Sequence, residues 1–271
     1  MSKELQIGVI GAGGRGGIAQ LAHNPDDGVR LTAGADTDLS ALEKFRQKMG
    51  SDVYTTSDYR EILAKPEIDA VFITHEHGDH VGCALALSAR FGIPLWMSAG
   101  THAALPRRDP KLNVQFASDG QSVALGGLRL PPFAVPHDTR EPLQLSCTDG
   151  DRRLGVLTDL GHVTGHVLEQ LAGCHALLLE SNHCPELLAR SHYPPFLKQR
   201  VGGAHGHLSN AQAAAALAQL RHAYMSTVVG AHLSEHNNRP ELVRAGFAAA
   251  LDCAAGDVLL SNRHGLDWLS V

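Results

Sequence analysis

The sequence predicts an α/β fold, and three observations support that prediction. Short apolar runs alternate with capped amphipathic stretches through residues 5–73, which is typical of parallel strands joined by helices. A glycine-rich turn follows the first run. Beyond residue 74 the histidines cluster, and Gly and Asp-Gly turns separate shorter strands. We therefore expect two parts, a segment 1–73 and a region 74–271, joined without a low-complexity linker.

The elements of the first segment follow from its apolar periodicity. We expect strands over residues 6–10, 29–35 and 68–73, and the last should be buried within a parallel sheet because it is mostly apolar. Helices are expected after the glycine-rich turn, over 40–49 and over 57–64, since Ser or Asp stands at the start of the last two. Together these elements predict a βαβαβ unit.

The region beyond residue 74 is expected to mix helices with short strands. Phe91-Gly92 can close a helix over 79–90, and Ser209 or Asn210 can cap an Ala-rich helix over 210–223. The strands expected here lie within 122–135 and over 143–147, 154–158 and 227–230.

The composition restricts the class of protein. A net charge of −5 gives no overall basic surface for nucleic acid, although a local basic groove can exist on an acidic protein. No apolar run approaches the ~20 residues that span a bilayer, and we expect no signal peptide. The five cysteines form no CxxC pair, so we expect a cytoplasmic protein without a disulfide framework. The 17 histidines suggest a metal or a proton-transfer site.

The glycine-rich turn has the spacing of a dinucleotide site. Gly11, Gly13 and Gly16 form GxGxxG between a predicted strand and a predicted helix, and Asp36 ends the next strand. Glycines let the backbone approach a pyrophosphate at the helix N-terminus, and an acid so placed binds a ribose hydroxyl. The turn therefore predicts an NAD(P) site, with a tight turn that binds no ligand as the alternative.

Three stretches of the first segment match a known family. IGVIGAGGRG, AGADTD and YTTSDYREILAKPEIDAVFI resemble the N-terminus of the glucose-fructose oxidoreductase/inositol dehydrogenase (Gfo/Idh/MocA) family. The resemblance covers residues 7–73 and implies a Rossmann-like unit. The EKP cofactor motif and the substrate domain of that family are not found in this sequence, so the nicotinamide side of the site looks absent.

Histidines and acids follow several predicted strands. Directly after residue 73 comes Thr74-His75-Glu76-His77-Gly78-Asp79-His80, an HxHxDH motif that places four ligand-type side chains in one turn. Imidazole nitrogen with carboxylate oxygen suits zinc, manganese or iron. Chance clustering on polar loops is the alternative. The further candidate ligands, each at the end of a later predicted strand, are His137, Asp159 and His232.

Between residues 68 and 268 the chain contains, in order, THEHGDH, PHDTREP, TDLGHVT, LLLESNH, YPPFLKQR, GGAHGHLSN and AHLSEHNN. With these motifs it resembles the small bacterial phosphodiesterase and exonuclease-like branch of the metallo-β-lactamase fold. The resemblance implies two divalent metal ions, zinc or manganese, and a hydroxide between them that attacks a phosphodiester. The ligands it implies are His75, His77 and His137 for one ion, Asp79, His80 and His232 for the other, and Asp159 as a bridge.

This resemblance also implies substrates and further site residues. The substrate would be single-stranded DNA, cut exonucleolytically, or a small phosphodiester. Asp79 would be essential for hydrolysis, and His207 is the candidate for protonating the leaving group or gripping phosphate, with a helix-entry residue as its alternative. Ordinary polar roles are the alternative for the outer candidates, which are His162, Glu180, Asn182 and His183 near the ligands and Lys198 and Arg200 as phosphate contacts.

The two resemblances meet at residues 69–74, a strand that either family could contain. The predicted fold is thus a metallo-β-lactamase-like αββα sandwich whose N-terminal strands are replaced by a Rossmann-like βαβαβ unit. The alternatives to a metal-dependent hydrolase are an NAD(P)-dependent oxidoreductase and a non-catalytic chimera. The sequence leaves the oligomeric state open.

Overall fold

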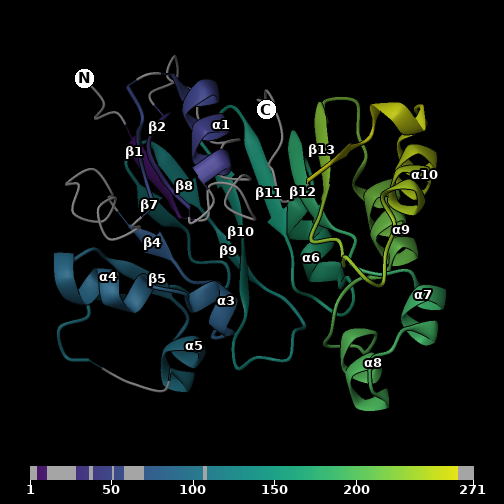
Figure 1. Cartoon of the computed structure of the whole chain (residues 1–271), viewed down its shortest axis with the longest axis horizontal. Coiled ribbons are helices and arrows are strands. Elements are labelled where there is room, and N and C mark those ends of the chain that lie inside the picture. Colours follow the sequence, from purple (N-terminus) through teal and green to yellow (C-terminus); the bar gives the residue numbers. More distant parts are fainter. Residues whose placement is uncertain are drawn as a thin grey trace. The chain divides into compact units, whose positions relative to one another are not determined.

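A computed structural model describes residues 5–10, 29–36, 39–50, 52–57, 70–105 and 109–261 (Figure 1). Gly11, Gly13 and Gly16 lie outside the described residues, as does most of the helix predicted over 57–64. The chain divides into two compact units. The first comprises Met1–Ala117, Ala124–Leu128 and Asn262–Ser270, and the second comprises Ser118–Val123, Arg129–Ser261 and Val271.

The first unit contains a small parallel sheet in the order β1-β2-β3. Its elements are β1 (Leu5–Ile10), β2 (Val29–Ala35), α1 (Leu39–Met49) and β3 (Tyr54–Thr56). Helix α1 packs directly on β2, because Phe45 is buried against Gly34. A Cβ atom at Gly34 would lie 2.4 Å from the Phe45 ring, so only glycine permits this approach.

The expectation that residues 68–73 form the third strand of this sheet is wrong. Strand β4 (Val71–Phe72) belongs to a separate parallel sheet with β5 (Leu95–Met97) and β6 (Val114–Phe116), in the order β4-β5-β6. The third strand of the first sheet is instead β3, whose three residues are too few to show an alternation of apolar and polar side chains. The described residues therefore form two three-stranded sheets where the sequence predicted one βαβαβ unit.

The helix predicted over 79–90 is broken into two. Helix α3 (Gly78–Val81) ends at Gly82, whose φ of 47° interrupts the α conformation, and α4 (Ala84–Phe91) ends at Gly92 with φ 71°. Helix α5 (Ala99–Ala104) follows β5 and is capped by the Ser98 hydroxyl. A small apolar core fills this region, made of Ile73, Ala84, Leu95, Met97 and Leu105.

The second unit is built on the larger sheet, whose order is β14-β13-β12-β11-β10-β8-β7 with β9 paired to β10. Strands β11 to β14 are parallel, and β10 runs antiparallel to β8, β9 and β11. The bounds are Val123–Leu125 for β7, Leu128–Leu130 for β8, Pro132–Ala134 for β9, Leu143–Thr148 for β10, Arg153–Leu157 for β11, Ala176–Glu180 for β12, Thr227–Ala231 for β13 and Leu259–Leu260 for β14. The tip of the β7–β8 hairpin is grouped with the first unit.

Helices α6 (Gly165–Leu171), α9 (Asn210–Leu220) and α10 (Pro240–Leu251) supply buried residues to the main core of this unit. The other helices here are α7 (Pro185–Arg190), α8 (Pro195–Val201) and the 3₁₀ turn Ala255–Asp257. Helices α9 and α10 lie side by side (Figure 1). Ser209 is the cap of α9, which confirms one of the two predicted positions, and with Gln212 it forms a reciprocal capping box. Among the described residues, no helix has the length and apolarity needed to cross a membrane.

Candidate metal centre

Three functional side chains stand at one edge of the larger sheet. Because β11, β12 and β13 are parallel, their carboxyl ends meet at the same edge. Asp159 lies two residues beyond β11, Glu180 is the last residue of β12, and His232 directly follows β13. Asp159 (φ 55°) and His232 (φ 58°) both adopt the left-handed backbone conformation, which costs on the order of 1 kcal/mol each and must be held by surrounding contacts.

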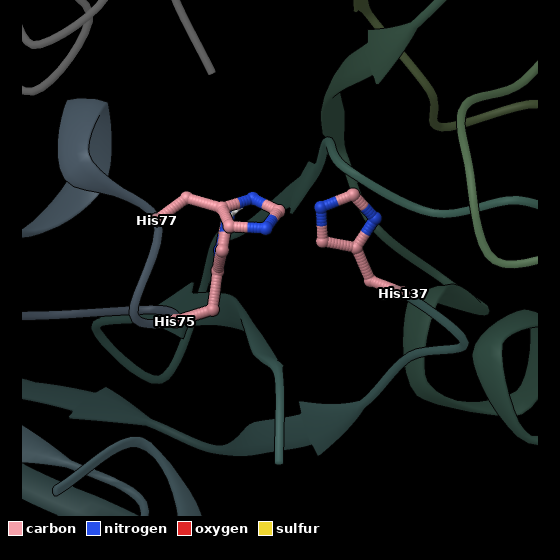
Figure 2. A group of neighbouring side chains, drawn as sticks. All are labelled: His75, His77 and His137. Atoms are coloured by element: carbon pink, nitrogen blue, oxygen red, sulfur yellow. Dashed lines mark hydrogen bonds between the residues drawn. The ribbon is translucent and has the colours of Figure 1, made fainter. Parts of the chain in front are cut away.

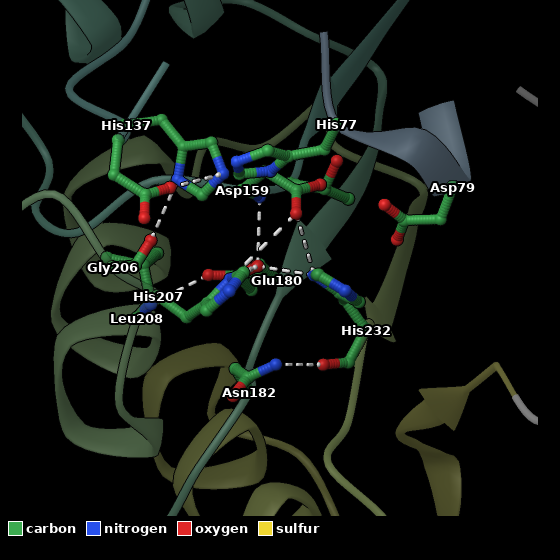
Figure 3. Close-up of polar contacts among 12 residues, drawn as sticks. His77, Asp79, His137, Asp159, Glu180, Asn182, Gly206, His207, Leu208 and His232 are labelled. Carbon is green, nitrogen blue, oxygen red and sulfur yellow. Dashed lines mark hydrogen bonds and ion pairs between the residues drawn. The ribbon is translucent and has the colours of Figure 1, made fainter. Parts of the chain in front are cut away.

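Glu180 is the centre of these contacts (Figure 3). Its Oε2 atom accepts hydrogen bonds from Nδ1 of His232 at 2.6 Å, from Nδ1 of His207 at 3.1 Å and from the backbone N–H of Asp159 at 2.9 Å. Its Oε1 atom accepts from the backbone N–H of Leu208 at 2.7 Å. One buried carboxylate therefore fixes two imidazole rings and the loops that carry them.

The protonation of the cluster follows from these partners. Burial alone would raise the pKa of Glu180, but the hydrogen bonds and charges of His207 and His232 outweigh it and lower that pKa to about 2. A carboxylate can only accept, so Nδ1 of both imidazoles carries a proton. In a neutral ring the lone pair is then on Nε2, the arrangement in which an outer carboxylate prepares a histidine to bind a metal ion.

His137 extends the row of imidazoles in the second unit. Its Nδ1 donates to the carbonyl oxygen of Gly206 at 3.1 Å, which again leaves the lone pair of a neutral ring on Nε2. Its ring centroid is 5.4 Å from that of His207, and the His207 centroid is 5.1 Å from that of His232. The three rings therefore form a continuous chain of edge-to-face contacts.

Two glycines allow the loops around the cluster to approach one another. A Cβ atom at Gly206 would lie 2.1 Å from the carbonyl oxygen of Arg200, and one at Gly161 would lie 2.2 Å from the carbonyl carbon of Ala204. Either contact is far shorter than real Cβ atoms tolerate, so glycine is required at both positions.

Of the outer candidates, two hold the loops directly. The His162 ring donates from Nδ1 to the carbonyl oxygen of Ala204 at 2.8 Å, and the Asn182 amide donates to the carbonyl oxygen of His232 at 2.9 Å. Burial lowers the pKa of His183, which favours its neutral form.

Glu180 accepts four hydrogen bonds at the centre of the cluster, whereas the sequence suggested only a residue near the ligands. The signal that could have found it is the fully buried strand Ala-Leu-Leu-Leu-Glu, because a buried acid at a strand end needs several donors.

The first unit contains the HxHxDH motif, which follows β4 and runs into α3. Nε2 of His75 and Nδ1 of His77 are 3.1 Å apart, with the rings edge to face (Figure 2). The Thr74 hydroxyl lies 3.1 Å from Nδ1 of His75 and 3.0 Å from Nδ1 of His80. The Asp79 carboxylate, in the first turn of α3, is 3.9 Å from Nε2 of His80. The motif therefore brings His75, His77 and His80 together and places Asp79 beside His80.

The donor atoms in each unit suit a divalent metal ion. In the second unit, the side chains of Asp159, Glu180, His207 and His232 have ligand-type atoms within 4.8 Å of one another. Because Nδ1 of both imidazoles donates to Glu180, His232 would bind an ion through Nε2. In the first unit, the 3.1 Å between the two imidazole nitrogens is close to the roughly 3.3 Å expected for two nitrogens on one tetrahedral ion at ~2.05 Å. Neutral imidazole and carboxylate are ligands that zinc and manganese accept.

The remaining predicted residues lie elsewhere. Asp36 directly follows β2 in the first unit, while the three glycines expected to act with it are outside the described residues. Lys198 donates to the carbonyl oxygen of Ala189 at 2.6 Å, and Arg200 forms an ion pair with Asp138.

Comparison with known proteins agrees with this architecture. Residues 42–232 match the family model described as the Beta-lactamase superfamily domain. The chain is 30% identical over 223 residues to exodeoxyribonuclease WalJ of Streptococcus pneumoniae, covering 78% of this chain and 83% of that protein. It is 29% identical over 194 residues to exodeoxyribonuclease YycJ of Bacillus anthracis, covering 69% and 72%.

Two solved structures share the fold at low sequence identity. Zinc-bound PqqB from Methylobacterium extorquens has a TM-score of 0.58 at 19% identity, covering 80% of this chain and 81% of that chain. The metallo-β-lactamase fold protein YhfI from Bacillus subtilis has a TM-score of 0.57 at 15% identity, covering 77% and 81%.

Proposed function

This chain belongs to the metallo-β-lactamase superfamily, and on that premise we propose that it is an exonuclease of single-stranded DNA with two divalent metal ions. At the coarser level it is a metal-dependent hydrolase of the nuclease or phosphodiesterase class, as its similarity to WalJ and YycJ indicates. The observation that carries the proposal is the Glu180 cluster, in which Asp159, His207 and His232 share one buried carboxylate.

The proposed ligand set is the one that the family resemblance implies. Each unit supplies imidazole and carboxylate side chains, which supports the proposal. In His137 and His232, Nδ1 donates a hydrogen bond, so Nε2 of the neutral ring has the lone pair that can bind a metal ion. The set consists of His75, His77 and His137 for one ion, Asp79, His80 and His232 for the other, and Asp159 as the bridge. We propose zinc or manganese as the metal.

The chemistry divides between the ions and the chain. Bound divalent ions lower the pKa of coordinated water and offset negative charge on phosphoryl oxygens. His207 is the proposed proton donor. Its Nδ1–H is held by Glu180, and a proton on Nε2 would pass to the leaving oxygen as that P–O bond breaks and an attacking hydroxide oxygen bonds to phosphorus.

We also propose that the chain divides at residue 73, that residues 7–73 are similar to the Gfo/Idh/MocA family, and that the protein is cytoplasmic. NAD(P) binding at Gly11, Gly13, Gly16 and Asp36 is the alternative activity. No described contact favours an oxidoreductase over the hydrolase.

The test is a cleavage assay on end-labelled single-stranded DNA with zinc or manganese added. Release of mononucleotides from one end, abolished by a chelator and restored by metal, is the expected result. Cleavage that persists in metal-free protein would contradict the metal-dependent chemistry. Internal cuts without end release would contradict the exonuclease assignment.

A further inference from the structure

We propose that the exposed face of α8 binds the nucleotide next to the bond being cut, with Phe196 stacking on its base and Arg200 contacting its phosphate. The inference rests on the proposed function, since a single-stranded nucleic acid supplies both an accessible base and a phosphate.

Arg200 lies close to His137, a candidate metal ligand of the same unit. The Nε atom of Arg200 donates to Oδ2 of Asp138, and the other oxygen of Asp138 lies 3.5 Å from Nε2 of His137. One carboxylate therefore separates the guanidinium from a proposed metal ligand. The Arg200 side chain is more than half exposed, so a substrate at the centre can reach it. Guanidinium groups bind phosphate through charge-assisted hydrogen bonds.

Backbone contacts fix α8 to the loop that carries His207. The backbone N–H of His207 donates to the carbonyl oxygen of Val201, the last residue of α8, at 2.8 Å. Gly206 packs against the carbonyl oxygen of Arg200 so closely that no side chain fits between them. The helix therefore holds a fixed position relative to the proposed proton donor.

Phe196, the second residue of α8, is 71% exposed. Phe196 and Arg200 are four residues apart on α8, so they are neighbours on one helix face with Cβ atoms about 5–6 Å apart. An aromatic ring beside a cation is the combination that binds single strands, by stacking on a base and attracting the backbone. The helix carries Lys198 and Arg200 and no acidic residue, and although Asp138 offsets the charge of Arg200, the exposed guanidinium can still donate hydrogen bonds to a phosphate.

Tyr224 provides a matched control. It is 78% exposed, yet it lies before the first residue of β13, whereas His232 follows the last. An aromatic side chain at the opposite end of the strand cannot contact the same nucleotide.

The experiment compares Phe196→Ala, Phe196→Trp and Tyr224→Ala on two substrates, a single-stranded oligonucleotide and bis-p-nitrophenyl phosphate. Loss of one stacked base corresponds to about tenfold in affinity. For F196A we expect the ratio of kcat/KM on the oligonucleotide to kcat/KM on the small diester to fall about tenfold, mainly through KM. F196W should restore the ratio, and Y224A should match the wild type.

A binding measurement separates this inference from the proposed function. Fluorescence anisotropy with a labelled phosphorothioate oligonucleotide should show about tenfold weaker binding for F196A and normal binding for Y224A. Equal binding and an equal kcat/KM ratio in F196A and wild type would overturn the inference while leaving the hydrolase intact. A wild type that binds DNA through Phe196 but cleaves neither substrate would instead overturn the proposed function.

Discussion

Nδ1 of His232 donates a hydrogen bond of 2.6 Å to Oε2 of Glu180, and neither side chain is more than 10% exposed. The bond joins the last residue of β12 to the residue that follows β13. A buried carboxylate without such donors would be strongly destabilising. The orientation of the His232 ring beside the end of β12 therefore depends on one side chain.

Replacing Glu180 tests that dependence. We expect Glu180→Gln to weaken metal affinity about 10- to 100-fold, as loss of outer hydrogen bonds to metal ligands does elsewhere. We also expect a Tm lower by several degrees, because the amide offers one accepting oxygen where four donors need two. Metal titration and thermal unfolding measure both effects. Glu186→Gln is the control, since Glu186 is exposed and accepts a hydrogen bond from the Cys184 thiol. Wild-type metal affinity in E180Q would contradict the role given to Glu180.

Asp79→Ala should abolish hydrolysis of bis-p-nitrophenyl phosphate while leaving the fold intact. The Asp79 side chain is 60% exposed, so its removal costs little packing, but it is a proposed ligand of the second ion. Release of p-nitrophenolate and circular dichroism are the measurements. Asp151→Ala, in the exposed turn between β10 and β11, is the control and should keep full activity. Unchanged turnover in D79A would refute the proposed mechanism.

His207→Ala separates proton donation from metal binding. Loss of a general acid lowers kcat by about 10²–10⁴-fold when the leaving group needs a proton. The loss should therefore be large on an oligonucleotide and much smaller on bis-p-nitrophenyl phosphate, whose leaving group is stable as an anion. The two rates are measured on protein of known metal content. Equal losses on both substrates would indicate that His207 positions the centre and does not donate the proton.

Gly206→Ala tests the close packing of the loops. The added Cβ would meet backbone oxygens of Arg200 and Val201 at 2.1 and 2.3 Å, and backbone cannot move aside as a flexible side chain can. We expect a lower Tm and about 100-fold lower activity, since a shift of ~1 Å at His207 misplaces the reacting groups. Gly165→Ala is the control, because nothing lies within 4 Å of its added Cβ and alanine favours helix α6. A G206A protein with the stability and activity of G165A would contradict this packing account.

The sequence was most informative about candidate site residues that stand at the ends of strands. Asp159 and His232 were placed correctly at the ends of β11 and β13, because a buried apolar strand is easy to recognise and its last residues are easy to number. The Ala-rich helix α9 and its cap were also predicted, since a Ser or Asn before an Ala-rich run is a local signal.

Other features depend on partners that are distant in sequence. Strand β4 pairs with β5 and not with β2, and no local pattern distinguishes the two pairings. The break between α3 and α4 rests on the positive φ of Gly82 within a stretch that otherwise suits a helix. Glu180 could be seen as polar and near the site, but its four donors come from three separate segments. Only the folded chain assembles them.

The central claim is that His75, His77, Asp79, His80, His137, Asp159 and His232 together hold two divalent metal ions. The direct test is metal content by plasma mass spectrometry, on protein purified without a histidine tag and dialysed against metal-free buffer. We predict close to two zinc, manganese or iron ions per chain. A metal content near zero in a protein that still unfolds cooperatively would contradict the claim.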